Sequence, residues 1–335
     1  MLTFTLRRLL LAIPTLLVIS LVIFLLVDLA PGSPMSEIPL TVPPDVRQKM
    51  IAALGADQPV FVRYFLWLRQ FFWVEPATVL DGWFGTNMAG NEQRILSWQS
   101  RSPVFTIIGQ RVPQTLTVIG TAYLIGILIA VPIGIYSAYR QYSWFDQAGT
   151  LFAMIGFSVP TFFSGTLFII IFAVWLGWFP TKYDTTLNVT DWASFVKQVQ
   201  QMALPVMTLG LANAAAISRY MRSSMLENMS QDYVRTARAK GMSERTVVLK
   251  HVLRNSMIPV VTVIALGIPS IFGGAIITEN LFGVNGIGAA LIGAIHANDI
   301  PMVQTLAFIF AILIVVFNLI ADVLYGFLDP RIRYD

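Results

Sequence analysis

The chain has 335 residues, of which 56% are hydrophobic and 12% are charged, and its mean hydropathy is +0.69. Soluble domains carry about 25% charged residues, so this composition excludes an ordinary soluble protein and predicts a membrane protein. The chain contains no cysteine, which excludes disulfides, thiolate metal sites and iron–sulfur clusters. Its two histidines, His251 and His296, are too few and too far apart in the sequence for a histidine metal site.

Six segments are apolar over about the 20 residues that a helix needs to cross the hydrocarbon layer. The first runs from Leu9 to Ala30. Its apolar run is longer than a signal-peptide core, which favours a retained anchor over a cleaved signal. In chain order the other five are residues 112–138, 147–178, 201–221, 258–281 and 302–328. This pattern predicts an all-α polytopic membrane protein with six transmembrane helices.

The stretch between the first two spans is expected to be an extracytoplasmic insert. Pro43 and Pro44 precede a predicted helix over residues 45–54, which Gly55 can end. Residues 59–73 predict a second helix, dense in aromatic side chains. Two interpretations stay open: a small cap resting on the membrane interface, where Trp and Tyr are favoured, or a surface that binds a partner protein. The expected domains are an N-terminal transmembrane helix (1–30), this insert (31–111) and a core domain (112–335).

Six spans place both termini on the same side of the membrane. With that side in the cytoplasm, the short inside loops are rich in Lys and Arg and the outside loops are poor in them. We therefore expect both termini to be cytoplasmic. Sorting of charge by membrane side also explains the net charge of +4 without a nucleic-acid partner. The basic residues expected inside, 13 of 22, are Arg7, Arg8, Arg140, Arg219, Arg222, Arg235, Arg238, Lys240, Arg245, Lys250, Arg254, Arg331 and Arg333.

Motifs for nucleotide binding and for catalysis are missing from the sequence. There is no G-x-x-x-x-G-K-[ST] phosphate loop and no H-E-x-x-H zinc motif. Gly286-Ile-Gly288 lacks the third glycine of a dinucleotide fingerprint and follows no predicted strand, so we expect it to be a loop. We therefore expect neither enzyme activity nor a bound cofactor in this chain.

The most informative segment lies between the fourth and fifth spans, over about residues 223–257. Residues 232–240 can form about two helical turns, and Gly241 supplies a break. Ser243 can then cap a second helix that runs to about Asn255. The sequence thus predicts two short helices joined at a glycine and held between two membrane spans.

Three basic side chains are expected to project from the first of these helices, namely Arg235, Arg238 and Lys240. They can pair with carboxylates of a cytoplasmic partner, for which the guanidinium fork of Arg is well suited. Alternatively, anionic lipid holds the segment as a basic juxtamembrane loop. The residues alone leave both interpretations open.

The same segment carries a resemblance to a known family. Thr236–Gly241 reads TARAKG and is followed by KHVLRNSMIPVV, which looks like the cytoplasmic EAA loop of binding-protein-dependent ABC importers. The segments LRRLLLAIPTL, LAPGSP, TENLFGVNGIG and ADVLYGFLDPRIRYD extend the resemblance over nearly the full length. It is closest to the peptide/opine/nickel branch, especially the oligopeptide and dipeptide permease subunits. The Glu and the Pro of the general EAA pattern are missing, as is usual in that branch.

The resemblance implies a non-catalytic subunit with the type I ABC importer permease fold, in the bacterial inner membrane. With a second, similar permease subunit it would form the translocation pathway for peptides. Two ABC ATPase subunits, which hold ATP and Mg, would dock on the cytoplasmic loops of the permease pair, and an extracytoplasmic binding protein would deliver the solute. An opine, glutathione, an oligosaccharide or a nickel chelate is the alternative solute. The residues that would couple to the ATPases are Arg235, Thr236, Ala237, Arg238, Ala239, Lys240 and Gly241.

Two spans carry proline and small residues near their middle, a pattern typical of transporter pathways. In the third span these include Pro160 and Ser164, followed by Gly165; in the fifth they include Pro269. Irregular backbone at membrane depth survives only where it lines a cavity or is buried in protein. The alternative is close packing of helices through small residues, and the sequence does not separate the two.

Polar residues within or next to the spans are further pathway candidates. Asn318 and Asp322 lie four residues apart, hence on one helix face of the sixth span, where Asp322 should find a partner or water. Asn213 lies in the fourth span. Glu279 and Asn280 end the fifth span on the outside, where Glu279 either attracts a peptide amino group or is simply solvated.

Two other function classes compete with the importer subunit. A secondary transporter would need coupling-ion residues inside its spans, and Asp322 is the one clear candidate. A membrane enzyme would need a cluster of acid, base or nucleophilic side chains, which the sequence does not show.

Overall fold

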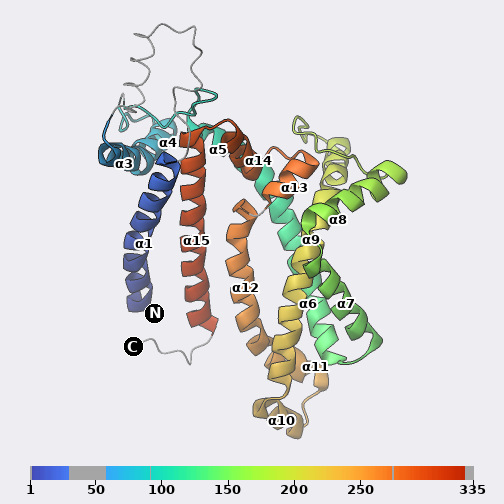
Figure 1. Ribbon diagram of the computed structural model, residues 1–335. Coiled ribbons are helices and arrows are strands. Elements are labelled where there is room, and N and C mark those ends of the chain that lie inside the picture. Colours follow the sequence, from blue (N-terminus) through green and yellow to red (C-terminus); the bar gives the residue numbers. More distant parts are fainter. Residues whose placement is uncertain (1, 30–57, 91, 274, 329–335) are drawn as a thin grey trace. The chain divides into compact units, whose positions relative to one another are not determined.

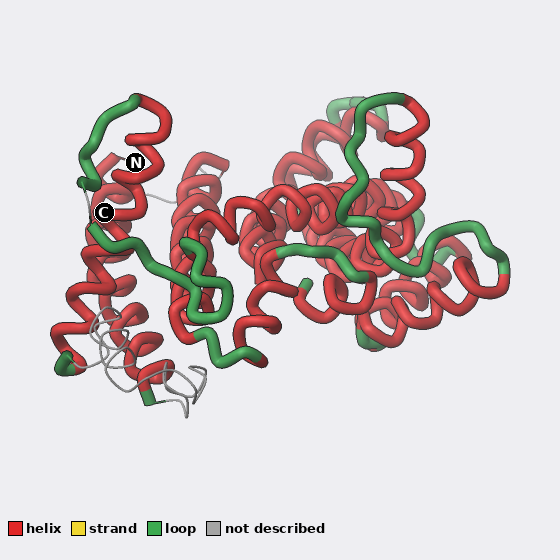
Figure 2. The backbone as a smooth tube through the Cα atoms, turned by 90° about the horizontal axis from the view of Figure 1, so that it is seen from above, coloured by secondary structure: helices red, strands yellow, loops and turns green. Residues whose placement is uncertain are grey.

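The computed structural model describes residues 2–29, 58–90, 92–273 and 275–328 (Figure 1). All regular structure in these residues is helical, which confirms the predicted all-α class (Figure 2). The helix expected over residues 45–54 lies outside the described residues.

The chain divides into two compact units, which we describe separately. Unit 1 comprises residues 1–10, 112–289 and 313–335, and unit 2 comprises residues 11–111 and 290–312. The expected boundary between the insert and the core domain, at residue 112, is also a boundary between the two units. Unit 2 differs from the expected insert because it also contains residues 290–312, which were expected in the core domain. The helices α1 (Leu2–Asp28), α5 (Val104–Thr115), α14 (Ile287–His296) and α15 (Ile300–Leu328) cross from one unit to the other.

Unit 1 is built around two long helices, α6 (Thr121–Tyr139) and α9 (Trp192–Met229). They approach closely at Gly134, where an added Cβ would lie 2.6 Å from the Cβ of Met221. Gly134 is therefore required at this crossing. The other elements wholly within unit 1 are η2 (Leu116–Gly120), α7 (Trp144–Ser158), α8 (Thr161–Phe168), η3 (Ile169–Trp175), α10 (Asp232–Ala239), α11 (Glu244–Thr246), η4 (Val247–Val252), α12 (Leu253–Gly273) and α13 (Ile276–Phe282), where η marks π-helical turns.

Unit 2 contains one long helix between α1 and α5. Its consecutive parts are α3 (Val60–Arg69), η1 (Gln70–Val74) and α4 (Glu75–Phe84), with helical backbone at both junctions. This confirms the helix predicted over residues 59–73 and extends it. Three of its aromatic residues, Tyr64, Trp67 and Phe71, are buried, and the Phe71 ring lies 4.8 Å from that of Phe308 on α15.

The third predicted span is broken rather than merely interrupted. Pro160 has no amide hydrogen and disfavours helical backbone at Val159, so α7 ends at Ser158. The next helix, α8, starts at Thr161, and the two parts are bent by 105°. The interruption was predicted, but not its angle.

The predicted end of the fifth span at Leu281 is wrong. Helix α12 passes through Pro269 and ends at Gly273, and α13 is a separate short helix. A second bent pair follows, because α13 and α14 meet at 91°. Helix α14 also occupies part of the expected outside loop over residues 282–301, so Gly288 lies in a helix while Gly286 remains in a loop.

Five described helices are long and apolar enough to cross a membrane, and counting each bent pair as one span gives up to seven. The predicted number of six lies within this range and stays a prediction. The five are Thr5–Asp28, Val104–Tyr139, Trp192–Met229, Glu244–Pro269 and Ile300–Val323.

Candidate coupling loop and buried polar sites

The loop after α9 has the predicted helix–glycine–helix geometry. Helix α10 ends at Ala239, and Gly241 has a φ of +78°, in the left-handed region that favours glycine. Its amide donates a hydrogen bond to the carbonyl of Arg238 at 2.9 Å. Helix α11 then begins at Glu244, so a single residue with positive φ turns the chain from one helix to the next.

The loop is anchored to the rest of unit 1 by an apolar face. Val234 and Ala237 of α10 are buried, and they belong to the same hydrophobic cluster as Val248 and Val252 of η4 and Met225 of α9. Val234 and Ala237 lie three residues apart, on one side of the helix. Because a larger side chain at Ala237 would displace η4, the alanine serves packing. The loop is thus a packed extension of α9 and α12.

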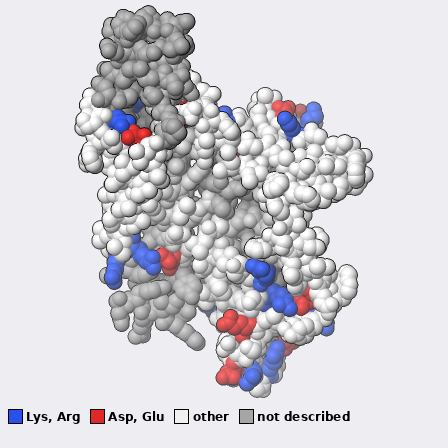
Figure 3. Space-filling view, viewed as in Figure 1, with Lys and Arg blue, Asp and Glu red and all other residues white. Residues whose placement is uncertain are grey.

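The opposite face of α10 is exposed and charged. Arg235, Thr236, Ala239 and Lys240 are all exposed. On the face seen in Figure 3, charged side chains gather over α10 and the adjoining helix ends, at the bottom of the view. This end of unit 1 is therefore a polar surface, in contrast to the largely uncharged sides of its long helices.

Arg238 already has a carboxylate partner within the loop. Its Nη2 donates to Glu244 Oε1 at 2.7 Å, and its Nε donates to Glu244 Oε2 at 3.1 Å. The hydrogen bond to Glu244 raises the pKa of Arg238 above its ordinary value. Glu244 follows Gly241 closely enough for this ion pair to close a ring across the turn, and both side chains stay partly exposed. The role of Arg238 in docking a partner stays a prediction. Arg235 has a weaker contact with Asp232 at 3.4 Å.

The helix after the glycine does not end near Asn255 as predicted. Ser243 stands at the N-cap position, although its hydroxyl contacts the Thr246 hydroxyl rather than a backbone amide. From Glu244 the helix continues without a break through η4 into α12. Asn255 does not stop it, because its side-chain amide donates to the His251 carbonyl and leaves the backbone ladder intact. The loop and α12 therefore form one continuous element.

Glu279 is buried, not solvated as one interpretation expected. Only 1% of the residue is exposed, and its Oε1 accepts a hydrogen bond from the Thr115 hydroxyl at 2.8 Å. Its Oε2 accepts from the Ala289 amide at 2.9 Å, so the carboxylate caps the first turn of α14. A Cβ on Gly286 would lie 2.1 Å from Oε1. This carboxylate therefore organises the α13–α14 turn.

The other polar residues predicted to line the pathway lie in different parts of the structure. Asp322 forms an ion pair with Arg8, Oδ2 to Nη1, at 2.9 Å, which gives it the partner that was expected. Asn318 and Asn280 are exposed, and Asn280 donates to the Ile276 carbonyl at 2.9 Å. Asn213 is half-buried where α9 meets α6.

Small residues in the interrupted spans make close contacts with neighbouring helices. A Cβ on Gly165 would lie 2.7 Å from Leu281, and one on Gly267 would lie 2.2 Å from the Tyr123 hydroxyl oxygen. These contacts favour the packing interpretation for both glycines. The Ser164 hydroxyl donates to the carbonyl of Thr161 at 3.1 Å. The pathway role of Pro160, Ser164 and Pro269 stays a prediction.

A buried ion pair was missed in the sequence. Arg222 of α9 donates through Nε and Nη2 to the two carboxylate oxygens of Asp146, at 2.6 and 2.8 Å. The Tyr142 amide also donates to Asp146, which is 2% exposed. The pair fixes the start of α7 to α9. The available signal was an acidic residue at the start of an apolar span, for which a basic partner should have been sought.

Within the described ranges, no group of three or more His, Asp or Glu side chains could hold a metal ion.

Comparison with known proteins identifies the class of the molecule. The family model described as "Binding-protein-dependent transport system inner membrane component" matches residues 130–334, and the companion model of its N-terminal region matches residues 1–119.

Curated relatives match over the full length. The chain is 37% identical to the oligopeptide transport system permease protein AppB of Bacillus subtilis and 38% identical to the glutathione transport system permease protein GsiC of Salmonella choleraesuis, each over 100% of both chains. It is 37% identical to a putative peptide permease protein of Brucella suis, over 99% of both chains. The chain therefore belongs to the family of binding-protein-dependent transport system inner membrane components, the non-catalytic permease subunits of ABC importers.

Proposed function

We propose that this subunit, together with a second permease subunit, forms the translocation pathway for di- or oligopeptides delivered by an extracytoplasmic binding protein. The observation that carries the proposal is the full-length similarity to permeases named for oligopeptides, peptides and glutathione. Glutathione is itself a tripeptide, so the three names share one chemical class. An opine, an oligosaccharide or a nickel chelate is the alternative solute.

The loop around Gly241 is proposed as this subunit's contact with the pair of ATPase subunits, which bind ATP and Mg and dock on the loops of both permease subunits. Its support is the division of α10 into an apolar face packed on η4 and an exposed polar face. A force on the exposed face reaches α12 directly, because α11, η4 and α12 are continuous. Binding of ATP can then bias the whole bundle between inward-open and outward-open states.

Both termini are proposed to lie in the cytoplasm. The Arg8–Asp322 ion pair supports a common side, since Arg8 lies near the start of α1 and Asp322 near the end of α15. The basic α10 surface supports the cytoplasm as that side, following the positive-inside rule.

Reconstitution in liposomes tests the proposed activity. We expect uptake of a labelled peptide only when the second permease subunit, the ATPases, the binding protein and ATP are all present. A free amino acid of similar size is the matched control for solute class. Uptake by the isolated chain driven by an ion gradient alone would instead identify a secondary transporter.

The docking surface is tested by charge changes on α10. Lys240→Glu combined with Arg235→Glu should release the ATPases during gel filtration, because both side chains are exposed. The matched control is Arg238→Glu combined with Glu244→Arg, which exchanges the two ends of an ion pair within the loop. We expect the exchange to retain the ATPases. Normal subunit ratios with the first double variant would contradict the docking role.

A further inference from the structure

The long helix of unit 2, Val60–Phe84, has an exposed side that is entirely apolar along its second half. The exposed residues Phe72, Trp73, Pro76, Val79, Leu80, Trp83 and Phe84 repeat at intervals of three and four, which places them on one helix face. The exposed fractions of Trp83 and Phe84 reach 77% and 72%. We call these seven residues the aromatic stripe.

The position of the helix relative to α1 gives its depth in a membrane. Arg63 binds Asp28, the last residue of α1, at 2.6 Å, and the Tyr64 and Ser20 hydroxyls lie 2.8 Å apart. The helix therefore crosses α1 within the last two to three turns of that span. A helix rises about 1.5 Å per residue, so this is the level where hydrocarbon gives way to lipid headgroups.

Contacts with α15 give the same depth independently. The Phe308 ring lies 5.2 Å from the Trp67 ring and 4.8 Å from the Phe71 ring, and Phe308 follows the start of α15 by about two turns. The helix thus crosses two membrane spans, each close to one end.

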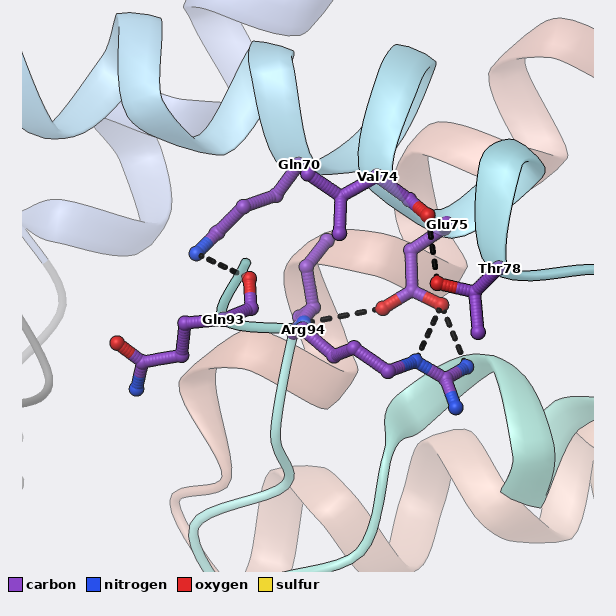
Figure 4. Close-up of polar contacts among 7 residues, drawn as sticks. Gln70, Val74, Glu75, Thr78, Gln93 and Arg94 are labelled. Carbon is purple, nitrogen blue, oxygen red and sulfur yellow. Dashed lines mark hydrogen bonds and ion pairs between the residues drawn. The ribbon is translucent and has the colours of Figure 1, made fainter. Parts of the chain in front are cut away.

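Every charged residue of this helix has an ion-pair or hydrogen-bond partner within unit 2. Arg63 pairs with Asp28, and Arg69 pairs with Glu92 at 2.5 Å. Glu75 is fully buried, where it accepts hydrogen bonds from the Arg94 guanidinium and the Ile95 amide (Figure 4).

Asp81, the fourth charged residue, is satisfied by the chain that follows the helix. Its carboxylate accepts hydrogen bonds from the Thr86 hydroxyl and from the amides of Met88 and Ala89, at 2.5, 2.7 and 2.9 Å. These bonds form because Gly85, with a φ of +67°, turns the chain back along α4. Three of the four charges are thus ion-paired and the fourth is hydrogen-bonded, which suits a helix in contact with lipid because a charge without any partner is costly there.

From these observations we propose that Val60–Phe84 lies in the membrane–water interface and that the aromatic stripe is immersed in lipid. The occupant of the stripe is thus the bilayer surface itself, at the end of the membrane where α1 finishes. Two further features favour lipid over a protein partner. Trp and Phe are favoured on helices that lie at this depth, and α1, which this helix crosses, is itself an apolar helix on which Val22 and Leu26 are exposed.

Site-directed spin labelling tests the proposal on the complete transporter in liposomes. The chain has no cysteine, so each introduced thiol labels one position of this subunit in a complex whose other thiols have been removed. Val79→Cys and Leu80→Cys report on the stripe. Gln93→Cys is the matched control, because Gln93 is exposed next to the same helix and its side chain points away from it (Figure 4).

We expect labels at Val79 and Leu80 to collide at least several-fold more often with oxygen, which concentrates in lipid, than with a water-soluble nickel chelate. The Gln93 label should show the opposite preference. Equal access of the chelate to all three labels would overturn the proposal. So would protection of the stripe from both reagents, which would mean that protein covers it; a change on adding the binding protein would identify that protein as the cover.

Discussion

The hydroxyl of Thr115 donates a hydrogen bond to Glu279 at 2.8 Å and accepts one from the Ile287 amide, also at 2.8 Å. One side chain at the end of α5 therefore bridges the carboxylate of α13 and the first amide of α14. Because both bonds are buried, their loss would leave polar atoms without compensation by water. The bent α13–α14 pair depends on this bridge for its geometry.

Replacing Thr115 with Val should destabilise the protein by about 1–3 kcal/mol, since the shape is kept while the buried Ile287 amide loses its acceptor. Thr115→Ser, which keeps the hydroxyl, should cost clearly less. The measurement is the thermal unfolding midpoint of the purified complex. An unchanged midpoint with Val, or a larger loss with Ser than with Val, would contradict the role of the bridge.

Gly286→Ala should be as harmful as a core overpacking change, about 1–3 kcal/mol, because its Cβ would meet Glu279 Oε1 at 2.1 Å and Thr115 Oγ1 at 2.4 Å. Gly293→Ala is the matched control in the same region, since its Cβ would meet no atom within 4 Å. Detergent-solubilised yield and thermal midpoint measure the difference. An unaffected Gly286→Ala variant would show that Glu279 can move away freely.

At Gly241 the backbone conformation, and not a lack of space for a side chain, restricts substitution. Its Cβ would have no neighbour within 4 Å, so only the positive φ restricts substitution. Gly241→Asn should preserve ATP-driven uptake, because Asn adopts left-handed backbone readily. Gly241→Val should cost about 1–2 kcal/mol in this conformation and uncouple ATP hydrolysis from uptake. Equal uptake rates for the two variants would refute a role for this turn.

In the Arg222–Asp146 pair the carboxylate is buried and the guanidinium partly exposed, so removing Arg222 alone should be costly. Arg222→Met should destabilise the protein by about 3 kcal/mol because it strands the Asp146 carboxylate. Adding Asp146→Asn should recover part of that loss. Arg219→Met serves as the control, since Arg219 is exposed over the Phe157 ring at 4.7 Å. Additive losses in the double variant would mean that the two residues act independently.

Much of the fold could be predicted because membrane spans leave a strong signal. A long apolar run must become a helix in lipid, so α1, α6, α9 and α15 were found from composition. The loop was also found, since helix breaks at glycine and basic residues at the cytoplasmic boundary follow local rules. The positive φ of Gly241 confirms that part of the prediction.

Pairings between distant residues could not be predicted from a single sequence. Glu279 looks like a solvated helix end until Thr115, far away in the chain, is brought to it. The continuation of the helix past Asn255 was missed because no local residue marks it, and packing of Val252 and Val260 stabilises it instead. The 105° angle at Pro160 was not predicted either, because a proline marks where a helix breaks and not the direction of the next helix.

The ion pair between Arg8 and Asp322 has a consequence for biosynthesis. The two residues lie 314 positions apart in the sequence, so all the residues between them must be translated before the pair can form. Until then, α1 is not joined to α15 through this ion pair. A nascent chain that stalls before residue 322 would leave α1 and α15 unconnected at this point, where membrane quality-control proteases could recognise it.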